Sequence, residues 1–100
     1  FPEVRRDLAI MVDSNVAAGD LVDCARAAAG QAISQAVGSK LVNLVVFDQY
    51  SGEGIDPGKQ SIGLGLTWQH SEHTLKDDEV NALTQTVLDA LKQRFDASLR

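Results

Sequence analysis

Residues 47–68 constrain the fold of this sequence more than any other stretch. Two apolar runs typical of strands are separated by about ten polar and turn-forming residues, Ser51–Gln60. Ordinary hairpins close with about two to five residues, so this loop is longer than strand reversal requires. Glycines in the strand that follows the loop weaken that strand unless something approaches its backbone closely, so we expect a sheet face kept clear for a ligand or partner. That face carries Ser61, Gly63, Gly65 and Thr67.

Alternation of apolar and polar residues predicts three strands. They are Asp7–Val12, Leu41–Tyr50 and Ser61–Gln69. In the second strand, alternation places Val45 and Phe47 on one face. The opposite face of that strand is predicted to carry Leu44, Val46, Asp48 and Tyr50. The core face of the third strand is predicted to carry Ile62, Leu64, Leu66 and Trp68.

Apolar residues at three- and four-residue spacing predict a helix over residues 17–38 and a second over residues 77–95. Gly30 costs the first helix about 1 kcal/mol relative to Ala, but the apolar stripe continues beyond it. We therefore expect one continuous helix, although a break at Gly30 would also satisfy the sequence. Thr74 followed by Asp77 resembles a capping box at the start of the second helix.

The predicted order of elements is βαββαβ, closed by a short strand within Asp96–Arg100. Right-handed crossovers then place both helices on one face of a four-stranded antiparallel sheet. The sequence therefore predicts a ferredoxin-like α+β fold, a two-layer sandwich whose second sheet face is open.

Composition narrows the function classes. The 100 residues suffice for one small domain, and Phe1 in place of Met leads us to expect a piece of a longer chain. A single cysteine, Cys24, excludes an internal disulfide and fits a reducing, cytoplasmic compartment. No apolar run is long enough to span a bilayer, so we expect no membrane partner. A net charge of −5 argues against binding nucleic acid by charge alone, while a local basic face is compatible with it.

Signals for catalysis or metal binding are weak. His70 and His73 form a His-x-x-His pattern, but no Cys or carboxylate stands at matched spacing, so we expect no metal site. The Gly-rich loop is followed by a strand at Lys59, not by a helix, and is therefore not a P-loop. No nucleophile with an adjacent base is readable, so we expect no catalytic residue in this chain.

Short motifs occur in a fixed order along the chain: Phe1–Pro2, Arg5–Asp7, Phe47–Asp48 with Tyr50, Gly52–Ile55, Gly58–Ser61, Thr74–Leu75, Asp78–Val80 and Leu99–Arg100. Together they resemble the ferredoxin-fold anticodon-binding domain of phenylalanyl-tRNA synthetase, which in bacteria ends the β subunit. Three features depart from the family pattern. The segment Gln31–Ser39 makes the first helix, or the loop after it, longer than we expect for the family. Lys76 stands where the family often has a capping Thr or Ser, so Thr74 is expected to take over the cap. Gly65 stands where the family often has a larger, polar or basic residue.

The resemblance implies a part in charging tRNA. The parent enzyme, an assembly of two α and two β subunits, activates phenylalanine with ATP and Mg²⁺ and transfers it to the tRNA. Its active site lies in the α subunit, so this domain is expected to hold no cofactor. The expected partners are the anticodon stem-loop of the tRNA, other domains of the β subunit, and the α subunit.

Open four-stranded sheets suit unpaired bases, which stack on rings and are read on their edges. Glycines on the open face would let a base or ribose lie against the sheet, Tyr50 offers a stacking ring, and cations offer phosphate contacts. Strand pairing is expected to group Arg5, Arg6 and Arg100 at one edge and to leave Lys59 at the other. The predicted RNA-binding residues are Arg5, Arg6, Tyr50, Lys59, Ser61, Gly63, Gly65, Thr67 and Arg100.

Each of these residues also has a structural alternative. Arg6 can form an ion pair with Asp7 or Asp48, and Tyr50 can cap the sheet edge. The glycines on the open face can pack against another domain. The loop glycines can serve turns with positive φ; they are Gly52, Gly54 and Gly58.

Two other functions share this strand order. An amino-acid-sensing regulatory domain would bind its ligand near the first strand–helix loop, Asp13–Gly19, which leaves the long hairpin unexplained. A small acyl-phosphate hydrolase would need an Arg in that loop, and none is present.

Overall fold

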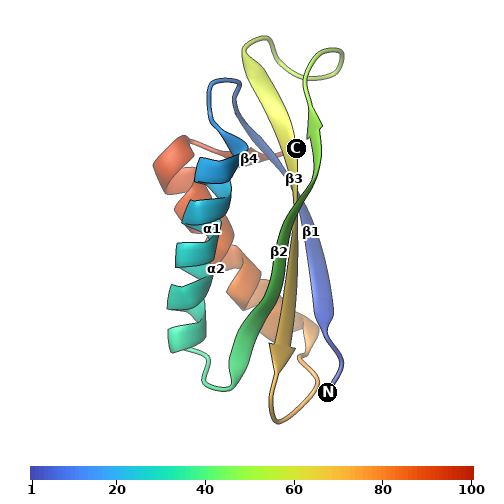
Figure 1. The fold of residues 1–100 in the computed structure, drawn as a ribbon, viewed down its shortest axis with the longest axis vertical. Coiled ribbons are helices and arrows are strands. Elements are labelled where there is room, and N and C mark those ends of the chain that lie inside the picture. The colour runs from blue at the N-terminus through green and yellow to red at the C-terminus, as the bar shows by residue number, and fades with distance from the viewer.

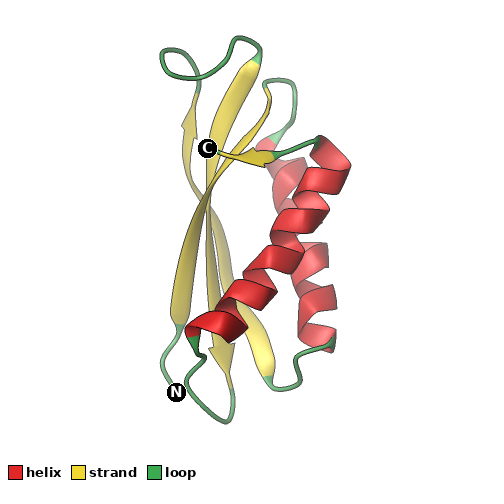
Figure 2. Ribbon diagram, turned by 180° about the vertical axis from the view of Figure 1, so that it is seen from behind, coloured by secondary structure: helices red, strands yellow, loops and turns green.

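Two helices cover one face of a four-stranded antiparallel sheet and leave the other face open, as Figure 1 and Figure 2 show for the computed structural model. The structure describes all 100 residues. The strand order is β2-β3-β1-β4, and every neighbouring pair is antiparallel. The predicted ferredoxin-like fold is confirmed. Its elements are β1 (Val4–Asp13), α1 (Ala18–Ser34), β2 (Ser39–Tyr50), β3 (Lys59–His70), α2 (Asp77–Phe95) and β4 (Ser98–Leu99).

The hydrophobic core lies between the helices and the covered face of the sheet. Trp68, its largest fully buried side chain, donates its indole N–H to Thr84 Oγ1 of α2 at 3.2 Å. This bond satisfies the one polar atom that the ring brings into the core. Alternation in β3 predicted this core face, and all four predicted residues have 0% exposure: Ile62, Leu64, Leu66 and Trp68.

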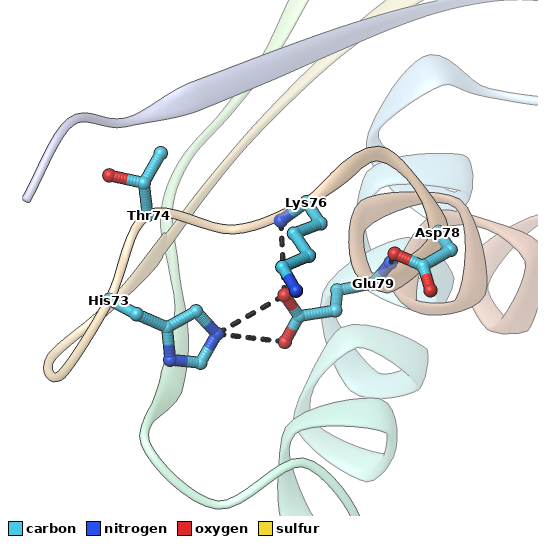
Figure 3. A pocket seen from close by; sticks show the side chains of 5 residues that line it. All are labelled: His73, Thr74, Lys76, Asp78 and Glu79. Atoms are coloured by element: carbon cyan, nitrogen blue, oxygen red, sulfur yellow. Dashed lines mark hydrogen bonds and ion pairs between the residues drawn. The ribbon is translucent and has the colours of Figure 1, made fainter.

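Both helices have the predicted phase, but the end of α1 and the cap of α2 differ from expectation. α1 runs through Gly30 without a break and ends at Ser34, before Gly38. α2 spans the predicted residues, and its first turn is not capped by Thr74, whose side chain points away from the helix in Figure 3. Instead, Glu79 Oε1 accepts the backbone N–H of the N-cap residue, Lys76, at 3.0 Å. The prediction for Thr74 was wrong because the helix starts one residue after Lys76, which leaves Thr74 outside it.

Strand β2 contains two irregularities that change which side chains reach the open face. The second lies between Val46 and Asp48, so Phe47 is an extra residue in the strand. Beyond it, Asp48 is opposite Gly63 and Tyr50 is opposite Ser61, on the open face. Strict alternation placed Asp48 and Tyr50 on the same face as Leu44 and Val46, and that prediction was wrong because one inserted residue reverses the phase of all that follow.

The long hairpin loop, residues 51–58, is folded on itself. Its three glycines have φ values of 117°, 86° and 80°, which confirms their expected role in turn geometry. The Tyr50 hydroxyl donates to Glu53 O at 2.6 Å, and Ile55, inside the loop, is only 8% exposed. Gly58 O accepts Ser14 N–H at 2.8 Å, which ties the hairpin to the β1–α1 loop.

Candidate nucleic-acid interface

Two aromatic rings are exposed on the open face of the sheet. Phe47 is 50% exposed and Tyr50 is 39% exposed, and both belong to the last part of β2. Side chains of β1 and β3 that alternate away from the core surround them. These are Arg5, Asp7, Ala9 and Met11 of β1, and Ser61, Gly63, Gly65 and Thr67 of β3.

The ring of Phe47 is paired with a cation from a strand that is not its neighbour. Arg5 Cζ of β1 lies 5.4 Å from the ring centroid of Phe47, within the range of cation–π attraction. Arg5 Nε also donates to Asp7 Oδ1 at 2.6 Å. Arg5 thus crosses β3, which separates β1 from β2.

Tyr50 forms a second pair of the same kind. Arg100 Cζ lies 5.5 Å from the Tyr50 ring centroid, although Arg100 follows β4 at the far edge of the sheet. The backbone N–H of Arg100 donates to Ala9 O at 2.9 Å, opposite the middle of β1. The side chain therefore reaches across the open face from one edge strand toward the other.

The backbone of β3 is not kept clear, contrary to the expectation from its glycines. Ser61 is 2% exposed, and Gly63 and Gly65 are also buried. A Cβ added to Gly63 would lie 2.8 Å from the Phe47 ring, and one on Gly65 would lie 2.6 Å from Arg5 Nη2. Side chains of this chain occupy the space that we expected a ligand to fill.

The cations are distributed differently from the predicted grouping. Arg6 is opposite Leu66 on the covered side of the sheet, and its Nη2 donates to Asp77 Oδ1 of α2 at 3.1 Å. It is an ion pair, as the structural alternative held, but with Asp77 in place of Asp7 or Asp48. Arg100 is beside the middle of β1 and reaches Tyr50, so it does not join Arg5 and Arg6 at one edge. The prediction failed because β4 is only two residues long and pairs with the second half of β1.

Lys59 lies at the hairpin end of the same sheet. Its Nζ donates to Asp13 Oδ1 at 2.7 Å, and this hydrogen bond raises the pKa of Lys59 above its ordinary value of 10.5. The adjacent Gln60 donates its amide to Val16 O at 2.9 Å. The β1–α1 loop, where an amino-acid-sensing domain would hold its ligand, is thus tied to β3 by two side chains.

The two histidines hold the loop before α2. Their rings stack with centroids 4.0 Å apart. His70 Nδ1 accepts Glu72 N–H at 3.0 Å, so its Nε2 is the atom that donates to Val37 O, also at 3.0 Å. His73 Nε2 contacts Glu79 Oε2 at 2.9 Å, as Figure 3 shows. These contacts give both histidines a structural role.

Phe47 is an exposed residue of the open face that the predicted set of RNA-binding residues does not include. It was placed on the face opposite Leu44, which is correct, and it stands in one of the family motifs. The available signal was an aromatic residue on the strand face opposite Leu44, since aromatic side chains are the surfaces on which unpaired bases stack.

Comparisons with known proteins agree on one family. The family model described as the ferredoxin-fold anticodon binding domain matches residues 1–100. The phenylalanine–tRNA ligase β subunit of Pseudomonas fluorescens is 50% identical over 100% of this chain, which spans 12% of that protein. The same subunits of Pasteurella multocida and Mannheimia succiniciproducens are 46% and 43% identical, with the same coverage. Neither helix is long and apolar enough to cross a membrane. The chain belongs to the family of ferredoxin-fold anticodon binding domains.

Proposed function

We propose that this chain binds the anticodon region of a tRNA as one domain of the β subunit of a phenylalanine–tRNA ligase. The family and the names of the relatives support this function. The observation that carries it is the presence of two exposed aromatic rings on the open sheet face, each with an arginine guanidinium within 5.5 Å.

Such a face fits unpaired RNA better than a duplex or a small ligand. Base–aromatic stacking contributes about 1–3 kcal/mol per base, and arginines next to the rings supply phosphate contacts and cation–π attraction. The stacking term compensates for the acidic net charge of −5, which weakens long-range attraction to phosphates. The proposed contacts are Arg5, Phe47, Tyr50, Thr67 and Arg100, with Lys59 at the border of the face.

The remaining residues of the predicted set have other roles in this proposal. Ser61, Gly63 and Gly65 lie beneath side chains of the open face, and Arg6 supports the start of α2. The parent protein would contain two α and two β subunits, act in the cytoplasm, and use ATP and Mg²⁺ at a site outside this domain. Its other β-subunit domains and its α subunit would be the protein partners. The domain then contributes position and tRNA identity, and no chemical step.

An NMR titration of the chain tests the proposed function. Three ligands are compared: an anticodon stem-loop RNA, the same stem-loop with substituted anticodon bases, and free phenylalanine. We expect the RNA to shift signals of Arg5, Phe47 and Tyr50, and the substituted RNA to shift them less. Shifts confined to Asp13–Gly19, produced by free phenylalanine alone, would contradict the proposal.

A further inference from the structure

Two glycines of β3 lie directly beneath the two groups of the first cation–aromatic pair. A Cβ on Gly63 would lie 2.8 Å from both Cε2 and Cζ of the Phe47 ring. A Cβ on Gly65 would lie 2.6 to 2.9 Å from three atoms of the Arg5 guanidinium group. Real Cβ atoms are essentially never found at such distances, so any other residue would push the ring or the guanidinium away.

The strand order explains why this pair needs glycines. Arg5 belongs to β1 and Phe47 to β2, and β3 lies between them. Side chains from the two strands that flank β3 can meet over it only by lying across it, where a side chain of β3 would normally stand. Glycine is the one residue that leaves this space free.

The Arg5 guanidinium is also held from a second side. Its Nε donates to Asp7 Oδ1 at 2.6 Å, while its Cζ stays 5.4 Å from the Phe47 ring centroid. Both side chains remain about half exposed, at 48% for Arg5 and 50% for Phe47. The pair is therefore held by the β3 backbone beneath it and by Asp7 beside it, while its outer side is exposed.

We propose that Gly63 and Gly65 are positioning residues that hold Phe47 and Arg5 together as one packed pair, the Arg5–Phe47 platform, against which an unpaired nucleobase stacks. The nucleobase ligand in this inference rests on the proposed function. The seating, by which we mean the placement of Phe47 and Arg5 by the two glycines, does not. It replaces the expectation that RNA contacts the two glycines directly. A base lying on the β3 backbone would first have to displace both the ring and the guanidinium.

The seating is tested without RNA. In Gly65→Ala, we expect the Arg5 Nε–Hε signal and the Phe47 ring signals to move, because the new methyl group displaces the guanidinium from the ring. The thermal midpoint should stay close to that of the parent chain, since the clash is with the end of a flexible, half-exposed side chain. Gly30→Ala is the matched control: a Cβ there would meet nothing within 4 Å, and it lies on α1, away from the open face. Unchanged Arg5 and Phe47 signals in Gly65→Ala would overturn the seating.

A double-mutant cycle tests the role in binding the anticodon stem-loop RNA. Arg5→Ala, Gly65→Ala and the double variant are compared by fluorescence anisotropy. We expect Gly65→Ala to weaken binding about fivefold or more, as loss of part of one stacking site would, and to have no further effect once Arg5 is absent. An equal loss in both backgrounds would overturn the proposal and assign a direct RNA contact to Gly65.

The two failures are distinguishable. If the parent chain itself does not bind the RNA, the proposed function and the stacking ligand both fail, while the NMR signals of Gly65→Ala still decide the seating. If the parent chain binds and Gly65→Ala binds equally well despite displaced Arg5 signals, the proposed function stands and the platform does not.

Discussion

Arg6 Nη2 donates to Asp77 Oδ1 at 3.1 Å and so joins β1 to the first residue of α2. Its neighbour Arg5 faces the opposite side of the sheet and contacts Phe47. Two consecutive arginines thus serve two different layers of the molecule, as alternation along a strand requires.

This difference gives a direct prediction. Arg6→Ala should leave the affinity for an anticodon stem-loop RNA within about twofold of the parent chain, because it removes only distant charge. Its cost to the free energy of unfolding should be at most about 1 kcal/mol, since Asp77 is 93% exposed and surface ion pairs stabilise little. Arg5→Ala, which removes the same charge from the open face, is the matched comparison. Equal losses of affinity in the two variants would show that RNA binding depends on the number of positive charges and not on the sheet face that carries them.

Tyr50 combines a ring that faces RNA in our proposal with a hydroxyl that holds the hairpin loop. Tyr50→Ala should lower RNA affinity by about 1–3 kcal/mol, the usual value of one stacked base. Tyr50→Phe keeps the ring and should bind almost as well, but it loses the 2.6 Å bond to Glu53 O and should be cleaved faster by protease within residues 51–58. If Tyr50→Phe binds as poorly as Tyr50→Ala, the ring is not the binding element.

Glu79 makes the stability of the domain depend on pH. The backbone N–H of Lys76, and then His73, lower the pKa of Glu79 below its ordinary value of 4.5. A carboxyl group whose pKa is lower in the folded state stabilises the fold above its unfolded pKa, and this contribution is lost as pH falls through the folded pKa. Glu79→Gln should therefore be less stable than the parent chain near pH 7, and the difference should shrink as pH falls below the ordinary value of 4.5 and vanish only below the lowered pKa of Glu79. Urea unfolding at several pH values measures it, with the exposed Glu72→Gln as control; a difference that persists at low pH would contradict this account.

Gly38 needs both its backbone conformation and its missing side chain. Its φ is 94°, and a Cβ there would lie 2.5 Å from His70 Cε1. His70 is 8% exposed and held by two backbone groups, so it cannot move aside cheaply. Gly38→Ala should cost about 2–4 kcal/mol of unfolding free energy, measured by urea denaturation.

Gly54→Ala separates the cost of a positive φ from the cost of a contact like that between residue 38 and His70. Gly54 has a φ of 86° but nothing within 4 Å of an added Cβ, so its replacement should cost only the backbone strain, about 1–2 kcal/mol. Equal costs at Gly38 and Gly54 would show that the contact with His70 has no energetic weight.

Regular periodicity allowed the sequence to predict most of the fold. The buried alternation from Ile62 to Trp68 and the apolar stripe of α2 identify their elements because each repeats over several turns or pairs. The extra residue at Phe47 could not be predicted, because a bulge is set by pairing with β3 and leaves no local signature. That single residue decided the face of Asp48 and Tyr50.

The candidate site was predicted by residue type better than by arrangement. Arg5, Tyr50 and Arg100 were named from charge and ring chemistry, and all three lie on the open face. Their pairing could not be foreseen, because Arg5 and Phe47 meet across a third strand and over glycines that offer no contact of their own. Sequence patterns report neighbours along one strand, and this pair joins strands that are not adjacent.

The most direct test of the account compares the two faces of the domain at equal charge. Affinity for a fluorescent anticodon stem-loop RNA is measured for Arg5→Ala/Arg100→Ala on the open face and for Arg26→Ala/Lys92→Ala on the exposed sides of the helices. Each variant removes two positive charges, so long-range attraction to phosphates falls equally. The account predicts a loss of about tenfold or more for the open-face variant, because each guanidinium contact contributes about 0.5–2 kcal/mol beyond its charge, and little change for the helix variant. Equal losses, or a larger loss for the helix variant, would contradict the claim that the open sheet face binds the RNA.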